Sequence, residues 1–203
     1  AGIEENRRFA RWCQQERPPR LAASFGLHAS FTLSDDTLKA CAEAAGDIGF
    51  HVHTAEGIED REYNLQHYGL PVVKRLDKYG IWNPRSLAIH CVHIDDEEME
   101  LLGQRDVSVI HNPESNMGNA VGRADIAAMW NHGLRVGLGS DGYTTDMFEG
   151  MKVANLIHKH GEGDPRAGSQ VPAMAFDNNI DIVCRHFGVQ TGRLLPDWQA
   201  DVI

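Results

Sequence analysis

The sequence has few cysteines, and they do not follow the patterns of a disulfide-rich domain or a zinc ribbon. The four cysteines lie far apart, with no CxxC pair: Cys13, Cys41, Cys91 and Cys184. Small stapled folds and structural zinc motifs both depend on characteristic cysteine spacings. We therefore expect four reduced, partly buried thiols.

Long apolar runs and blocks of like charge are also missing. No stretch approaches the roughly 18 apolar residues of a membrane helix, and the first residues lack the apolar core and cleavage pattern of a signal peptide. The formal net charge is -10, and no Lys/Arg-rich run could neutralise a phosphate backbone. We expect a cytoplasmic protein that binds neither nucleic acid nor membrane.

What the sequence does contain is a regular alternation of short apolar runs and helical patterns. The predicted strands are 20–30, 50–56, 86–92, 107–113 and 135–142. The predicted helices are 3–16, 34–46, 59–69, 71–80, 95–105, 123–133 and 146–160. The strand spacing is close to the roughly 30 residues of a βα unit. This alternation predicts an α/β fold with a parallel sheet covered by helices.

The carboxyl ends of all five predicted strands carry residues that can ligate a metal or transfer a proton. In α/β proteins these ends face the ligand site. Along the chain they carry His28, His53 with Glu56, His90, His111 and Asp141. A random scatter of eleven histidines would rarely give this pattern, so we predict that the strand ends form the functional site.

The residue types at these ends suit metal-assisted hydrolysis. A catalytic metal takes neutral imidazole nitrogens and carboxylate oxygens and keeps one position open for water. We predict His53 and Asp141 as metal ligands, with Asp141 also accepting the proton of the water. Glu56 could carry a proton to a leaving group, and His90 could stabilise a developing negative oxygen.

Other residues have weaker or simpler interpretations. His28 and the predicted turn HNPESN, with Asn112 and Asn116, could contact substrate. For His51 we predict a satisfied core position deeper in the barrel, and for His93 a hydrogen bond within a loop. Asp141 taken in isolation could simply cap the following turn. The histidines on or beside predicted helices are expected to have surface or packing roles: His67, His132, His158, His160 and His186.

Four segments in this order, HTAE, HCVH, HNPESN and LGSDG, resemble the amidohydrolase superfamily and its cytosine/guanine deaminase and chlorohydrolase-like branch. The stretches IEENRRFARW and LGSDGYTTDMFEGMK look closest to aminohydrolases associated with selenium metabolism. The resemblance covers nearly the whole chain.

This resemblance implies metal-dependent hydrolysis of a C–N bond, namely deamination of a cyclic amidine or heteroaromatic amine by metal-activated water. One divalent metal ion is implied, zinc or alternatively iron. It also implies that His53 binds the metal, Glu56 shuttles the proton and His90 positions the water. Asp141 would complete the metal site, and His28 would touch a small-molecule substrate.

The sequence departs from the family at its beginning. Family members carry an HxH pair on the first barrel strand, and no strand precedes Pro18 here. A complete barrel takes about 250 residues. We therefore expect residues 1–203 to form strands four to eight of a partial (β/α)8 TIM barrel. The N-terminal strands and the β-sandwich domain would be absent, and the end of the chain would approach that sandwich.

Competing functions follow from this departure. Two protein ligands would bind a metal weakly, so the chain alone is expected to be inactive. A non-catalytic truncated fragment, or a module that covers its exposed sheet edges by forming a homo-oligomer, is one alternative. Hydrolytic dechlorination on the same scaffold is another.

Overall fold

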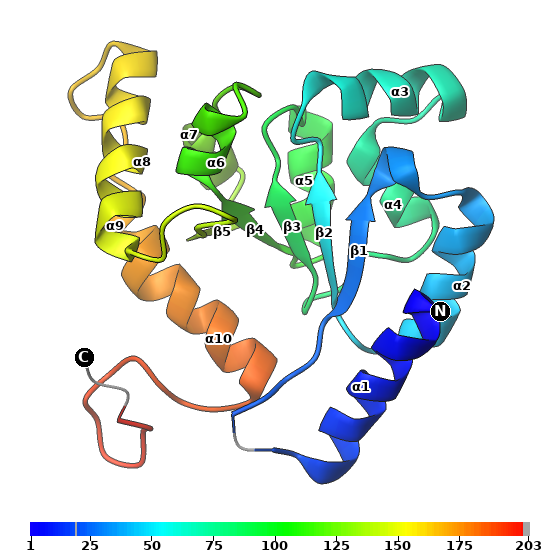
Figure 1. Cartoon of the computed structure of the whole chain (residues 1–203). Coiled ribbons are helices and arrows are strands. Elements are labelled where there is room, and N and C mark those ends of the chain that lie inside the picture. The colour runs from blue at the N-terminus through cyan, green and yellow to red at the C-terminus, as the bar shows by residue number, and fades with distance from the viewer. Residues whose placement is uncertain (19, 201–203) are drawn as a thin grey trace.

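A parallel sheet forms the centre of the computed structural model, which describes residues 1–18 and 20–200 (Figure 1). Its strands are β1 (Phe25–Ala29), β2 (Phe50–Thr54), β3 (Leu87–His90), β4 (Ser108–His111) and β5 (Arg135–Leu138). Neighbours pair in parallel, in the order β1-β2-β3-β4-β5. Parallel neighbours need a crossover connection, usually a helix. The predicted α/β fold of five βα units is confirmed.

Helices precede the first strand, lie between the strands and follow the last one. They are α1 (Gly2–Glu16), η1 (Ser30–Thr32), α2 (Asp35–Ala45), α3 (Ile58–Tyr68), α4 (Val72–Lys78), α5 (Asp96–Gln104), α6 (Pro113–Gly118), α7 (Ile126–Asn131), α8 (Met147–Glu162), α9 (Val171–Ala173), the π-helical turn η2 (Met174–Asn178) and α10 (Asn179–Phe187). None of the helices in the described part of the chain is long and apolar enough to cross a membrane.

Local sequence signals set several of these boundaries. Ser34 caps α2, since its hydroxyl accepts a hydrogen bond from the Thr37 amide, and Gly46 ends the same helix, as predicted. Several helices depart from the prediction, α6 and α10 among them. The HNPESN segment was treated as a turn but forms α6, with Pro113 in its first turn. No helix was predicted over α10, which follows η2 directly.

The two faces of the sheet differ in burial around β2. Four residues in register across one face are fully buried under the helices: Val52, Ala88, Val109 and Val136. The opposite face carries His51 and His53 of β2, because successive strand side chains alternate between faces. His51 is exposed there, so the prediction of a core position was wrong. Helix α10 covers part of that face, since Asn179 and Ile182 lie against Gly137 of β5.

The strand directions fix where the site lies. In Figure 1 the arrowheads of β1 to β3 share one end of the sheet, and α3 and α6 lie near that end. The helices α1 and α10 lie toward the opposite end, on either side of the sheet. The carboxyl ends of all five strands therefore form a single edge.

Candidate active site

Three histidines from neighbouring strand ends meet at the carboxyl edge of the sheet. The ring centroids of His53 and His90 are 5.5 Å apart, and those of His28 and His53 are 5.6 Å apart in an edge-on arrangement. The Nδ1 atom of His28 lies 3.0 Å from the hydroxyl of Thr32, which ties the ring to the loop after β1. The structure thus brings together the predicted site residues of β1, β2 and β3.

His90 stands between two carboxylates. Its Nε2 atom lies 3.5 Å from Glu56 Oε2 and 3.7 Å from Asp141 Oδ2. Its Nδ1 atom lies 2.8 Å from Asn116 Oδ1, so one ring nitrogen is fixed and the other faces both acids. The predicted catalytic residues from β2, β3 and β5 therefore surround one point.

An unusual backbone conformation turns His90 toward this point. The register pairs His90 with Thr54, which is fully buried on the helix-covered face. His90 and Cys91 instead have left-handed φ angles of 72° and 53°, which break the alternation of the strand. Ala55 and Asp141 are also left-handed, at 47° and 53°. Such conformations cost roughly 1–3 kcal/mol each and cluster at functional sites.

The short helix α6 and its C-cap residue Asn119 contact two carboxylates and one imidazole of the site. The Ser115 hydroxyl donates to Asp141 Oδ2 at 2.6 Å, and Asn119 Nδ2 donates to Glu56 Oε1 at 3.1 Å. Asn119 Nδ2 also lies 3.4 Å from Ser115 Oγ. Together with the contact between Asn116 and His90, these bonds connect α6 to every predicted catalytic residue.

Sequence reasoning missed Ser115 and Asn119. They lie four residues apart, the spacing that places two side chains on one face of a helix. That signal was hidden because the segment was treated as a turn. Asn116, predicted to touch substrate, is only 1% exposed and contacts His90.

The protonation states of the predicted metal ligands suit a divalent ion. Burial lowers the pKa of His53, which favours its neutral form. The Ser115 hydroxyl, together with the Gly142 amide, lowers the pKa of Asp141 despite partial burial, so the carboxylate is ionised. A neutral imidazole and a carboxylate are zinc ligands. Within residues 1–18 and 20–200 no group of three His, Cys, Asp or Glu side chains could hold a metal ion.

His111 does not join this group, although it also ends a strand. It lies on the helix-covered face, where its Nε2 atom is 3.2 Å from Nε2 of His158 in α8. His158 Nδ1 in turn lies 3.2 Å from Arg123 Nη1. Burial lowers the pKa of His111 to about 3 and that of His158 to about 4, so both rings are neutral near pH 7. Their position is consistent with packing, the role predicted for His158.

The second histidine of HCVH also lies outside the cluster of carboxylates. The Nε2 atom of His93 is 2.7 Å from the carbonyl oxygen of Val121, which is the loop hydrogen bond predicted for it.

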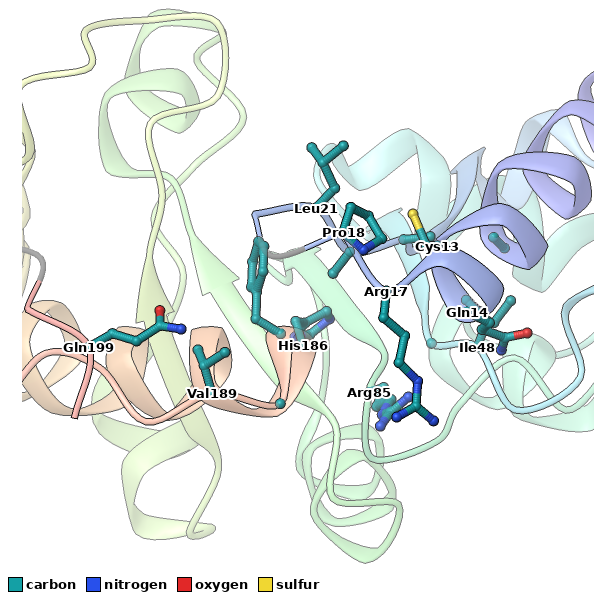
Figure 2. Close-up of a pocket in the computed structure, with 16 residues that line it drawn as sticks. Cys13, Gln14, Arg17, Pro18, Leu21, Ile48, Arg85, His186, Val189 and Gln199 are labelled. Carbon is teal, nitrogen blue, oxygen red and sulfur yellow. The ribbon is translucent and has the colours of Figure 1, made fainter. Parts of the chain in front are cut away.

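A cavity of about 650 Å³ lies at the other end of the sheet, away from these residues. Figure 2 shows Cys13 and Arg17, from the end of α1, on one side and His186 and Val189, from the end of α10, on the other. Ile48, just before β2, also lines it. The site formed by His28, His53, Glu56, His90 and Asp141, called the strand-end site below, is therefore separate from this cavity.

Comparison with known proteins gives a consistent result. The profile described as "Amidohydrolase family" matches residues 2–203. The chain is 34% identical over 210 residues to a 5'-deoxyadenosine deaminase of Methanothermobacter thermautotrophicus, covering 100% of this chain and 48% of that protein. It is 37% identical over 208 residues to a 5-methylthioadenosine/S-adenosylhomocysteine deaminase of Pelotomaculum thermopropionicum, covering 99% and 48% respectively.

Solved structures share the fold. An adenosine deaminase from Xanthomonas campestris with bound zinc superposes with a TM-score of 0.88 at 26% identity, covering 98% of this chain and 46% of that one. An atrazine chlorohydrolase from Arthrobacter aurescens has a TM-score of 0.74 at 20% identity, covering 90% and 44%. The chain thus spans about half the length of the relatives it matches.

Proposed function

Because this chain belongs to the amidohydrolase family, we propose that the complete protein removes an amino group from a heteroaromatic ring or cyclic amidine by hydrolysis. The observation that carries this proposal is the position of His90 Nε2, 3.5 Å from Glu56 and 3.7 Å from Asp141. Deamination requires a proton to leave water and reach the departing amine. Three proton-binding groups around one point suit that transfer.

We propose His53 and Asp141 as ligands of one divalent metal ion, with zinc favoured over iron. The support is their donor chemistry and the bound zinc of the Xanthomonas campestris adenosine deaminase. Catalytic zinc sites usually take three protein ligands, so further donors must join these two. When bound, the ion would act as a Lewis acid and lower the pKa of the attacking water.

The side chains then divide the reaction among them. Asp141 accepts one proton as the water oxygen bonds to the ring carbon and the electron pair of the ring C=N bond moves to the ring nitrogen. His90 hydrogen-bonds to that oxygen as negative charge develops on it. Glu56 delivers a proton to the amine nitrogen, the ring C=N bond re-forms, the C–N bond to the amine breaks, and ammonia leaves. The proton held by Asp141 then restores Glu56. Ser115 keeps Asp141 ionised for the first step, and Asn119 orients Glu56 for the last.

The proposed substrates are 6-aminopurine nucleosides and their 5'-modified forms. Support comes from the names of the relatives, which are deaminases of 5'-deoxyadenosine and of 5-methylthioadenosine. We propose that His28, exposed beside His53, contacts the substrate. For Asn116 we propose orientation of His90 in place of substrate contact, because its side chain is buried.

The direct test is ammonia release by the complete protein from adenosine, 5'-deoxyadenosine and 5-methylthioadenosine. Asp141→Asn should lower kcat by a factor of about 1,000 or more while the circular dichroism spectrum stays unchanged, because the amide cannot accept the proton. Near-normal turnover by this variant would contradict the assignment. Chloride release from a chlorotriazine, without ammonia release from any aminopurine, would favour dechlorination.

Metal content separates the enzyme from a non-catalytic fragment. The 203-residue chain, purified by itself and dialysed, should hold well under one zinc per molecule by elemental analysis, because two protein ligands bind weakly. The complete protein should hold about one. Stoichiometric, tightly held zinc in the 203-residue chain would contradict the proposed need for further ligands.

A further inference from the structure

A buried carboxylate lies directly beneath the turn that joins two of the site residues. Asp60 of α3 is 4% exposed, and its Oδ2 atom accepts a hydrogen bond from the Ala55 amide at 3.0 Å. Ala55 is fully buried and left-handed, and it lies between His53 and Glu56. The bond therefore acts on the residue whose conformation sets the direction of Glu56 relative to His53.

The same carboxylate reaches the loop after β1. The backbone amide of Phe31, which follows His28 by three residues, opposes the rise in the pKa of this carboxylate. Its Oδ1 atom accepts from Asn64 Nδ2 at 2.9 Å, and Asn64 Oδ1 accepts from the Ser30 hydroxyl at 2.6 Å. The segments that follow the strands carrying His28 and His53 are thus linked to one carboxylate, one through Asn64 and the other through the Ala55 amide.

Arg75 anchors this network from α4. Its guanidinium is 1% exposed, donates to Ser30 O at 2.6 Å and Oγ at 2.8 Å, and stacks on the Tyr68 ring at 3.5 Å. Burial raises the pKa of Asp60 to about 6, while the amides of Ala55 and Phe31 and the side chain of Asn64 oppose that rise. The positive charge of Arg75 also favours the ionised form of Asp60.

We propose that Asp60 is a positioning residue of the strand-end site, which holds the loop after β1 and the loop after β2 in one fixed arrangement. The effect that we expect this positioning to have on catalysis rests on the proposed function. Beyond its bond to Asn64 in the same helix, the carboxylate accepts the Ala55 amide, in the segment between His53 and Glu56. Asn64 in turn accepts the hydroxyl of Ser30, in the segment that follows His28.

The chain offers a matched control for this role. Glu98 in α5 is a fully buried carboxylate that accepts backbone amides, those of Val73 at 2.8 Å and Asp95 at 3.2 Å. Neither amide lies next to a residue of the proposed site. Glu98→Gln removes a buried carboxylate charge, which pairs with Arg61 at 2.6 Å, without touching the two loops.

The test compares Asp60→Asn with Glu98→Gln in the complete protein. The asparagine has one acceptor oxygen and presents an NH2 group to an amide that needs an acceptor. By hydrogen exchange, Asp60→Asn should speed exchange of peptides covering 29–33 and 54–57 about tenfold, while 113–118 stays unchanged. On the aminopurine substrate its kcat should fall about tenfold or more with KM within a factor of about 3. Glu98→Gln should change neither readout.

Two results would overturn the proposal. One is unchanged exchange in both loops of Asp60→Asn. The other is a loss of kcat that follows the loss of thermal stability equally in the two variants. If Asp60→Asn does not fold, Ser30→Ala, which removes the bond to Asn64, should give a smaller change in the same loops. Exchange needs no substrate, so absence of deaminase activity in the wild type would overturn the proposed function while exchange still decides the role of Asp60.

Discussion

The ends of β3 and β4 carry a histidine each, yet the two residues belong to different parts of the molecule. His90 and His111 are both 1% exposed. His90 has a left-handed backbone and faces Glu56 and Asp141, whereas His111 stays on the helix-covered face and contacts His158. Position at a strand end therefore does not decide function, because the backbone angle at the last residue sets which face the ring joins.

The two ends also differ in what their surroundings provide. The end of β3 has a strained backbone and carboxylates within reach of a ring nitrogen, an arrangement suited to proton chemistry. The end of β4 has two neutral rings, and His111 Nδ1 has no hydrogen-bond partner among the described residues. We therefore expect changes at His90 to alter activity and changes at His111 to alter stability.

The largest expected effect is that of His90→Gln, which removes the imidazole between the two carboxylates. Its kcat should fall by a factor of about 100 to 1,000, the usual cost of losing one group that stabilises a developing oxyanion. Its free energy of unfolding in urea should change by about 1 kcal/mol. His111→Gln is the matched control and should keep kcat within a factor of about 3. Equal losses of kcat in both variants would remove the distinction between the strand ends.

The second effect is on stability as a function of pH. Histidines in the unfolded chain bind protons below about pH 6.5, but in the folded state His111 and His158 do so only near pH 3 and pH 4. The unfolded state therefore binds more protons between these limits. The stabilisation that comes from keeping these two histidines neutral is fully present above pH 6.5. As the pH decreases toward 3, the free energy of unfolding falls by at most about 1.4 kcal/mol per pH unit for each histidine.

The variant that tests this pH dependence is His111→Gln, measured by urea unfolding at pH 7.5, 6, 5 and 4. It should lower the free energy of unfolding at pH 7.5 by about 1–3 kcal/mol, because a buried contact is lost. Its slope between pH 6 and pH 4 should be shallower than that of the wild type. Identical slopes would mean that His111 is not buried in its neutral form.

A smaller effect is expected from Ser115→Ala, which removes the 2.6 Å bond to Asp141. The carboxylate loses the group that contributes most to its low pKa, so kcat should fall about tenfold, equivalent to about 1.4 kcal/mol. Ser86→Ala is the control, since this buried serine accepts the Phe50 amide at the opposite end of the sheet. If both variants lose kcat in proportion to their stability, Ser115 has no special role.

The smallest effect is expected from Asn119→Ala. Asn119 is exposed and its bond to Glu56 is 3.1 Å long, so kcat should fall by a factor of about 3 to 5 with KM nearly unchanged. Met117→Ala, at an exposed position on the same short helix, should leave kcat unaltered. An unchanged kcat in Asn119→Ala would indicate that Glu56 is oriented by other contacts.

The sequence predicted the parts of the site that depend on periodicity. Alternating strands and helices place His53, His90 and Asp141 at one edge of a parallel sheet whatever the details of packing, and the family assignment from the four motifs was correct. It could not predict which way His111 turns, because its partner His158 is 47 residues away in the chain. The left-handed φ at His90 was equally hidden, since non-glycine residues rarely adopt it.

The compactness of α6 has a consequence for how the gene can vary. Ser115, Asn116 and Asn119 reach Asp141, His90 and Glu56 from little more than one helical turn. Point changes in this turn affect one contact at a time. A codon inserted or deleted between Ser115 and Asn119 would rotate the residues beyond it by about 100° and break their register with the others. We therefore expect this segment to tolerate insertions and deletions less well than substitutions.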